Sequence, residues 1–287
     1  MPVEPFPILR LGDRSIDVRS RTVVMGVLNR TPDSFFDRGA TWQLDALVAR
    51  AGELVDDGAD LLDVGGVKAG PGPEVGLAEE LDRVVPAVEA LRARFDVPVS
   101  ADTWRAEVLD AACAAGAVVG NDISGFADPG YLVTAARHSA TVVATHIRLA
   151  PRVPDPAPEY ADLVGDVTAF LLERARRAEA AGLSADRIVL DAGLDLGKTA
   201  AQSAVLLRET AVHASLGHPF LVSASNKRFI GDLLGLDVAD RRSESLAAVA
   251  HAVAHGARIV RVHDVRGSVR VTRVVDAIVA EALAVAA

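Results

Sequence analysis

Short apolar runs rich in β-branched residues alternate along the chain with longer stretches in which apolar residues recur at helical spacing. Eight such pairs can be counted, so that one strand and one helix pass about every thirty-six residues. This alternation is typical of repeated βα units around a parallel sheet. The strands are predicted at residues 22–28, 60–64, 97–102, 117–121, 141–146, 187–191, 219–223 and 258–263.

The pattern favours a closed barrel over an open doubly wound sheet, because the pairs are regular and no GxGxxG fingerprint follows the first strand. Before that strand, residues 8–20 alternate polar and apolar about a Gly-Asp turn, which predicts a β-hairpin that could plug the bottom of the barrel. The proline-rich segment 151–160 is interpreted as a loop. Residues 1–287 are therefore expected to form one α/β domain, a (β/α)8 TIM barrel with an N-terminal β-hairpin.

Composition narrows the classes of partner. Half of the 287 residues are hydrophobic, and the net charge of -9 argues against a surface that follows nucleic-acid phosphates. The single cysteine, Cys113, cannot form an internal disulfide and is expected to fill a helix contact in a reducing compartment. No leader pattern and no run of about eighteen apolar residues is found. We expect a cytoplasmic protein without nucleic-acid or membrane partners.

Almost every predicted strand ends in a side chain that can hydrogen-bond, ligate a metal or carry charge. Because the carboxyl ends of barrel strands converge on one rim, these side chains could share one pocket. Each alone could instead cap the following helix, but capping explains the pattern at all eight strands less readily. The residues are Asn29, Asp63, Asp102 with Thr103, Asn121 with Asp122, His146, Asp191, Ser225 with Lys227, and Arg261 with His263.

Two motifs resemble known sites without meeting their requirements. GLDLGKT at 193–199 is one residue short of the spacing of a phosphate-binding P-loop. His146 and His263 stand near aspartates, but no HxH, HExxH or Cys/His cluster occurs. We expect neither a nucleotide loop nor a tightly held zinc.

One series of segments is similar to a known family, the dihydropteroate synthases. The matching segments cover nearly the whole chain in the family's order and spacing. They are MGVLNRTPDSFFDRG at 25–39, GADLLDVGG at 58–66, VSADTWRAEV at 99–108, NDISG at 121–125, LDAGLDLGKT at 190–199, SNKRFIG at 225–231 and RVHDV at 261–265.

The resemblance implies a reaction that joins hydroxymethyl-dihydropterin pyrophosphate to p-aminobenzoate and releases pyrophosphate. It makes Asp102, Asn121, Asp191 and Lys227 pterin-binding groups. It places Arg261 against the pterin face, Arg261 and His263 on the pyrophosphate, and Asn29 on a magnesium ion bound to that leaving group. Asp102, Lys227 and Arg261 would also act in catalysis, with Asp102 favouring a cationic pterin intermediate. A pterin edge presents donors beside acceptors, which carboxylates, an amide and a lysine can complement.

Several positions depart from the family pattern. Where the family usually reads DVGGESTRPG, residues 63–72 read DVGGVKAGPG, and the threonine and arginine that would hold the pyrophosphate and aminobenzoate ends are absent. Each lost charge-assisted hydrogen bond is worth roughly 1.5 to 3 kcal/mol. Other unusual residues at family positions are Arg30, Arg38, Thr145, Ala192, Asp195, Leu196 and Asn226.

NRTPDSF, VKAGPG and SNK together resemble the divergent second-copy subtype of actinobacteria. The sequence thus predicts a retained pterin pocket with weak or absent condensing activity toward p-aminobenzoate. The alternatives are an active synthase of folate biosynthesis, in which Lys68, Arg30 and Arg38 compensate, and a non-catalytic pterin or folate-binding module. Because family members usually dimerise, the apolar helices after the last two strands could form a homodimer face, or could pack only on the barrel.

Overall fold

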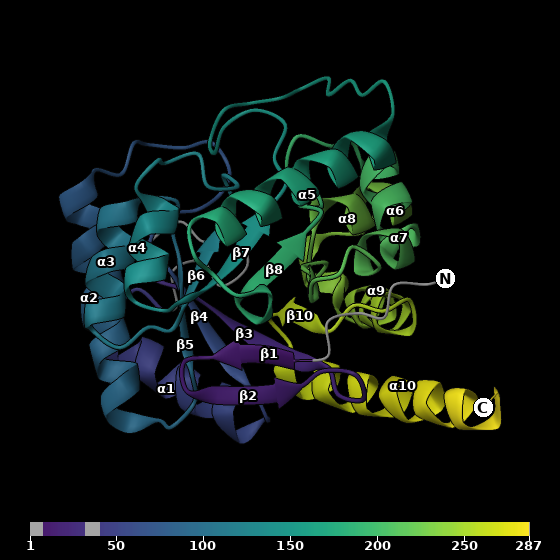
Figure 1. Cartoon of the computed structure of the whole chain (residues 1–287), viewed down its shortest axis with the longest axis horizontal. Helices are drawn as coiled ribbons and strands as arrows, with labels where there is room; N and C mark the ends of the chain where they lie inside the picture. The colour runs from purple at the N-terminus through teal and green to yellow at the C-terminus, as the bar shows by residue number, and fades with distance from the viewer. Residues whose placement is uncertain (1–7, 32–40, 287) are drawn as a thin grey trace.

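The computed structural model describes residues 8–31 and 41–286. Eight parallel strands close into a barrel in the order β10-β3-β4-β5-β6-β7-β8-β9 (Figure 1). Their bounds are β3 Val23–Asn29, β4 Leu61–Gly65, β5 Val99–Asp102, β6 Val119–Asp122, β7 Thr141–Thr145, β8 Ile188–Asp191, β9 Phe220–Val222 and β10 Ile259–Val262. The predicted barrel is confirmed, and each predicted strand overlaps an observed one.

Helices follow the strands and surround the barrel (Figure 1). Their bounds are α1 Leu44–Asp56, α2 Leu77–Arg94, α3 Ala106–Ala114, α4 Tyr131–Arg137, α5 Leu163–Ala180, α6 Ala200–Arg208, α7 Thr210–Ala214, α8 Arg228–Leu234, α9 Arg242–Ala254 and α10 Val265–Ala286, with 3-10 turns at Ala185–Arg187 and Val238–Asp240. Helix α1 illustrates the packing, because Leu47, Ala51 and Leu54 recur at helical spacing and all are buried. Apolar stripes of this kind fix the helices on the outside of the sheet.

A hairpin closes the amino end of the barrel. Strands β1 (Ile8–Leu11) and β2 (Arg14–Asp17) pair antiparallel, and Figure 1 shows them across that end. Leu9 and Leu11 belong to one buried cluster with inward-facing strand residues such as Met25 and Val119. The predicted plug is confirmed, because its apolar residues cover the side chains that fill the amino end of the barrel.

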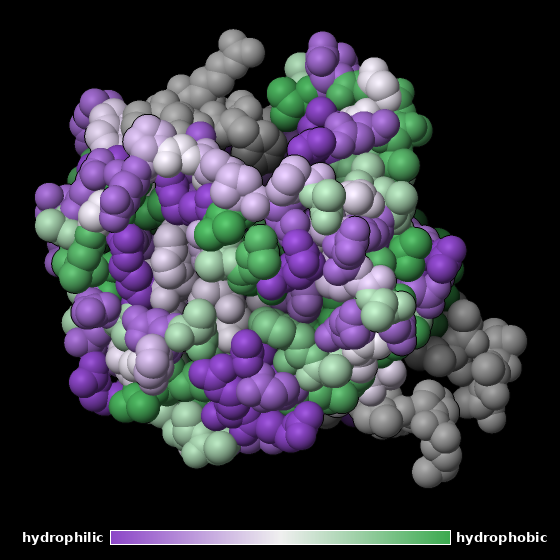
Figure 2. All heavy atoms as spheres, turned by 90° about the horizontal axis from the view of Figure 1, so that it is seen from above, coloured by the Kyte–Doolittle hydropathy of each residue, from purple (hydrophilic) through white to green (hydrophobic). Residues whose placement is uncertain are grey.

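The surface is mixed in character. Figure 2 shows hydrophilic and hydrophobic residues interspersed over the visible face. Helix α10 leaves Val274 and Ile278 exposed, and α8 leaves Leu233 and Leu234 exposed. Among the described residues, no helix is both long and apolar enough to cross a membrane. The segment 151–160 forms a loop, as predicted.

Candidate functional site

A connected cluster of polar side chains lies at the carboxyl rim of the barrel. Arg261 on β10 donates from Nε to Asp63 Oδ2 at 2.6 Å and from Nη2 to Asp102 Oδ2 at 2.7 Å. The Asn121 amide donates to the same Asp63 oxygen at 3.1 Å. Four strands, β4, β5, β6 and β10, therefore bring one side chain each into a single network, as the convergence of strand ends predicts.

The cluster holds two carboxylates against one guanidinium. Asp63 is fully buried, and the Asp102 side chain is only 15% exposed. Burial raises the pKa of the Asp102 carboxyl to about 7; the positive charge of Arg261 opposes this shift and the negative charge of Asp63 adds to it. The rim thus presents an excess of acceptors in a poorly solvated place, which suits a ligand that donates several hydrogen bonds.

Asp191 and Lys227 lie beside this cluster on the next part of the rim. The Asp191 carboxylate accepts from the Gly193 N–H at 2.8 Å, and burial raises its pKa. The Lys227 ammonium donates to the Leu194 carbonyl oxygen at 3.1 Å, and its charge and that of Arg261 act on Asp191. The structure therefore brings Asp102, Asn121, Asp191, Lys227 and Arg261 to one rim.

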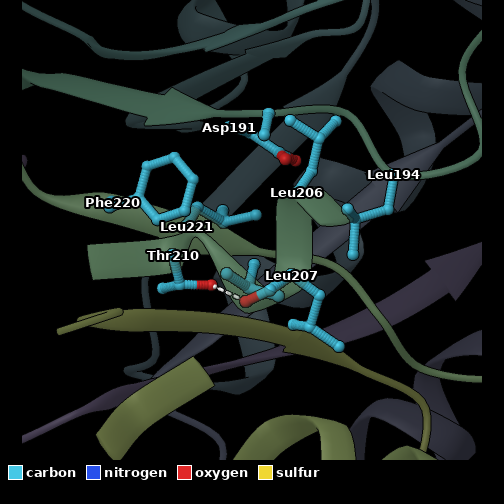
Figure 3. A pocket seen from close by; sticks show the side chains of 9 residues that line it. Asp191, Leu194, Leu206, Leu207, Thr210, Phe220 and Leu221 are labelled. Carbon is cyan, nitrogen blue, oxygen red and sulfur yellow. Dashed lines mark hydrogen bonds between the residues drawn. The ribbon is translucent and has the colours of Figure 1, made fainter. Parts of the chain in front are cut away.

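Figure 3 shows the side of Asp191 that faces the helix layer. The space there is lined by Leu194, Leu206, Phe220 and other apolar residues, and the Thr210 hydroxyl at its edge donates to the Leu207 carbonyl oxygen at 2.6 Å. This space is too narrow for a water molecule. It belongs to the packing behind the rim and does not form a ligand pocket.

Asn29 and His263 complete the rim. A side chain added to Gly65 would meet Asn29 Oδ1 and the Asp102 carboxylate, both at 3.5 Å, so these two groups flank the same glycine. His263 Nδ1 lies 3.0 Å from the Ser225 hydroxyl. Burial lowers the pKa of His263 to about 3, with the charges of Arg261 and Lys227 acting in the same direction. His263 is therefore a neutral imidazole at neutral pH.

Two other polar residues at strand ends have structural roles. Asp122 accepts from the N–H groups of Ser124 at 2.6 Å and Phe126 at 2.9 Å, and so closes its own turn. The Thr103 hydroxyl donates to Glu80 at 2.5 Å, away from the cluster. Neither side chain joins the cluster, and neither caps the following helix, because α3 and α4 have no side-chain hydrogen bond at their N-caps.

The lysine of GLDLGKT turns inward. Lys198 Nζ lies 2.9 Å from both His146 Nδ1 and the Leu196 carbonyl oxygen, and 3.3 Å from the His146 carbonyl oxygen. Burial lowers the pKa of Lys198 to about 7 and that of His146 to about 3. Lys198 therefore joins its own loop to the end of β7, a role that the motif spacing did not reveal.

The loop after β4 is attached to the loop after β7. Arg152 donates from its backbone N–H to the Ala69 carbonyl oxygen at 3.2 Å and from its guanidinium to the carbonyl oxygens of Lys68, at 3.3 Å, and Pro73. Val67 is buried beneath it. The hydrogen bonds from Arg152 thus attach the altered VKAGPG segment to the loop after β7.

Arg30 does not have the role expected of a compensating cation. Its guanidinium donates to the carbonyl oxygens of Asp82 at 3.0 Å and Arg83 at 2.9 Å on helix α2. Pro86 lies inside this helix and has no N–H to offer the Asp82 carbonyl four residues earlier. Arg30 supplies that missing donor and is engaged away from the cluster, which corrects the expectation that it supports a ligand. Arg38 lies outside the described residues.

Among the described residues, no group of three or more histidines, cysteines and acidic residues is arranged to hold a metal ion.

Asp63 is the central residue of the cluster that the sequence analysis leaves out of the predicted binding residues. The sequence pattern marks it only as a strand-end carboxylate, and the signal that singles it out is its place inside the apolar run LLDV.

A closed (β/α)8 barrel with a buried acid, amide and guanidinium cluster at its carboxyl rim defines a class of small-molecule-binding barrels. Residues 25–263 match the family model described as pterin binding enzyme. The chain is 41% identical to dihydropteroate synthase of Synechocystis sp. over 275 residues, which cover 95% of each chain. It is 43% identical to inactive dihydropteroate synthase 2 of Mycobacterium leprae over 264 residues, 90% of this chain and 91% of the relative.

A crystal structure of Yersinia pestis dihydropteroate synthase with a sulfonamide drug complex superposes with a TM-score of 0.91 at 38% identity, covering 96% of this chain and 99% of that one. The chain belongs to the dihydropteroate synthase family of pterin-binding enzymes. Since a synthase and a protein named inactive are similar to it to nearly the same degree, family membership does not by itself assign the reaction.

Proposed function

We propose that this protein binds a pterin at the barrel rim and has weak or no dihydropteroate synthase activity. The observation that carries the proposal is the contrast between two parts of the site. The cluster of Asp63, Asp102, Asn121 and Arg261 is complete and connected. In the loops around it, positions 67–70 carry no threonine or arginine, and the Arg30 guanidinium contacts helix α2.

A pterin fits the cluster by its chemistry. Its pyrimidine edge carries amino and ring N–H donors beside a carbonyl acceptor. Asp102 and Asp191 offer buried acceptor oxygens, while Asn121 and Lys227 offer donors. Because these groups are poorly solvated, a ring without the matching donors would leave them unpaired, and the site would discriminate against it.

Arg261 must change partners when such a ligand binds. In the structure its guanidinium spans the carboxylates of Asp63 and Asp102. A pterin that donates to Asp102 would compete for that carboxylate, and the planar guanidinium could then stack on the ring. The same group thereby balances the charge of the rim carboxylates and would form one wall of the pterin site.

The case against efficient synthesis rests on the second-substrate side. Positions 67–70 carry no threonine or arginine, and their loop is attached through Arg152. Arg30 is engaged by α2. Leu196 supplies no aromatic wall. Loss of two charge-assisted hydrogen bonds, at roughly 1.5 to 3 kcal/mol each, lowers kcat/KM by about a hundredfold or more.

Magnesium enters the proposal only with a pyrophosphate-bearing substrate. The Asn29 amide oxygen is a hard ligand of the kind magnesium accepts, and it flanks Gly65 opposite Asp102. Asn29 would hold the ion on the leaving group, where the ion stabilises the departing charge.

A transfer assay with hydroxymethyl-dihydropterin pyrophosphate, p-aminobenzoate and magnesium tests the reaction. We expect kcat/KM at least about a hundredfold below that of the Escherichia coli synthase run in parallel. The matched variant V67E/K68S/A69T/G70R restores the family loop and should raise activity if the loop is limiting. Turnover of the unmodified protein near that of the control enzyme would instead establish the second candidate, an active synthase, which the similarity to the Synechocystis synthase favours.

We also propose a homodimer, because two helices that follow the last two strands each leave apolar residues exposed. Leu233 and Leu234 on α8 and Val274 and Ile278 on α10 are more than half exposed. Light scattering on the purified protein should give twice the 30.0 kDa chain mass. A monomeric mass at micromolar concentration would refute this part of the proposal.

A further inference from the structure

Asp195 occupies an unusual position in the loop after β8. Its φ of +68° lies in the left-handed region, which residues other than glycine seldom adopt. Its carboxylate accepts from the Phe229 N–H, with Oδ1 at 3.2 Å and Oδ2 at 3.3 Å, and from the Ser203 hydroxyl at 3.3 Å. Its own N–H donates to the Ser203 oxygen at 3.1 Å. The strained backbone is thus held by contacts to two different helices.

The Phe229 N–H belongs to the first turn of α8, whose amide groups have no partner within the helix. Lys227 is the N-cap of α8, and its side chain makes no capping hydrogen bond. Asp195 therefore supplies, from another loop, the acceptor that a capping residue would normally provide. The helix that begins beside Lys227 is fixed to the loop after β8.

The same loop also contacts the Lys227 ammonium directly, because the Leu194 carbonyl oxygen accepts from Nζ at 3.1 Å. The loop is anchored further along by Lys198, which bonds the Leu196 carbonyl oxygen and the end of β7. On the other side, Asn226 has a φ of +57°, and its N–H donates to the Ser245 hydroxyl at 2.9 Å. Lys227 is thus set between two fixed segments.

We propose that Asp195 is a positioning residue for Lys227, holding its ammonium at the rim in the orientation that a ligand meets. The inference rests on the proposed function for the identity of that ligand. The contact between the loop after β8 and the start of α8 does not depend on any ligand. Loss of the Asp195 carboxylate would remove the hydrogen bonds that the loop after β8 accepts from Phe229 and Ser203, and the lysine would sample other orientations.

Asp195→Gly is the informative variant. Glycine adopts a φ of +68° without strain, so the substitution removes the carboxylate and relieves the backbone at once. Asp195→Asn is the matched control, because asparagine tolerates the left-handed region and keeps one oxygen that can accept from the Phe229 N–H.

The first measurement needs no ligand. The chain contains three lysines, Lys68, Lys198 and Lys227, so trace acetylation followed by mass spectrometry reports each separately. We expect the labelling of Lys227 relative to Lys68 to change at least about twofold in Asp195→Gly and to stay near the unmodified value in Asp195→Asn. An unchanged ratio in Asp195→Gly would overturn the positioning role.

The second measurement is a calorimetric titration with 6-hydroxymethylpterin. Asp195→Gly should weaken binding about fivefold, and Asp195→Gly combined with Lys227→Ala should bind no more weakly than Lys227→Ala alone, because one effect acts through the other. Independent, additive losses would contradict the inference. If the unmodified protein binds no pterin, the proposed function fails, whereas the labelling ratio still decides the role of Asp195.

Discussion

Asp63 accepts from both Asn121 and Arg261 and is fully buried. Replacing it with alanine would leave the Asn121 amide without this acceptor and the Arg261 guanidinium with Asp102 alone. Breaking a buried ion pair in this way should lower the free energy of unfolding by about 3 to 5 kcal/mol. Urea titration of Asp63→Ala measures the loss.

The control is Asp232→Ala, which breaks the solvent-exposed pair between Arg228 and Asp232 and should leave the free energy of unfolding nearly unchanged. If both substitutions lowered the free energy of unfolding equally, the rim cluster would contribute no more to stability than a solvent-exposed ion pair does.

His213 is a buried histidine whose titration should be visible in the stability of the protein. It is fully buried, its ring stacks on Phe220 at 5.6 Å, and burial lowers its pKa to about 4. The unfolded chain, with a histidine pKa of about 6.5, binds more protons between pH 6.5 and 4. The folded state should therefore lose about 2 to 3 kcal/mol of stability as the pH falls through that window.

His213→Phe keeps an aromatic ring against Phe220 and removes the titrating group. Urea midpoints measured at pH 7 and pH 4.5 should differ less in this variant than in the unmodified protein. The exposed His255 provides the control, since His255→Gln should leave the pH dependence as it is. A pH dependence that His213→Phe leaves unaltered would contradict the assignment.

Residue roles were predictable where chain position alone determines them. The strand-end placement of Asp102, Asn121, Asp191, Lys227 and Arg261 was sufficient to bring them to one rim. It was not sufficient to separate Asp63, which joins the network, from Asp122, which closes its own turn. That distinction depends on which way each side chain points from its strand and on the partners it meets there, and those of Asp63 lie far away in the sequence.

At the scale of elements, Arg30 and helix α2 form a testable pair. The guanidinium donates to the Asp82 carbonyl that Pro86 leaves without a helical partner. Arg30→Met should lower the free energy of unfolding by about 1 to 2 kcal/mol. In a Pro86→Ala background the restored N–H takes over, and the same substitution should cost clearly less.

Thermal or urea unfolding of the four proteins in this cycle gives the coupling between Arg30 and Pro86. A vanishing coupling would mean that Arg30 stabilises α2 in some other way.

The interaction also explains why the sequence suggested a ligand-binding role for Arg30. Arg30 follows a strand end and carries charge, as a ligand-binding residue would. Its partner is a backbone carbonyl that lacks a helical donor because of a proline 56 positions later, and the residues around Arg30 give no sign of it.

For the whole molecule, barrel closure was predictable because eight strand and helix pairs recur regularly and no GxGxxG fingerprint follows the first strand. The hairpin followed from its alternation and its Gly-Asp turn. The cross-connections were not predictable, such as that from Arg152 to the loop after β4, because they join segments about 80 residues apart through backbone atoms.

The hairpin contributes to stability as a plug. Leu9 is fully buried among residues from the amino ends of several strands. Leu9→Ala should lower the free energy of unfolding by about 2 to 5 kcal/mol, the usual cost of a core cavity. Ile8→Ala, on the exposed face of the same strand, should cost far less, and similar losses for both would argue against a plug.

The central claim is that the rim keeps a pterin pocket although its outer loops have changed. Calorimetric titration of the purified protein with 6-hydroxymethylpterin tests it most directly, with Asn121→Leu as the variant that removes one donor from the cluster. We predict saturable binding with Kd below about 100 µM for the unmodified protein and at least about tenfold weaker binding for Asn121→Leu. No binding heat, or equal affinity in both proteins, would contradict the claim.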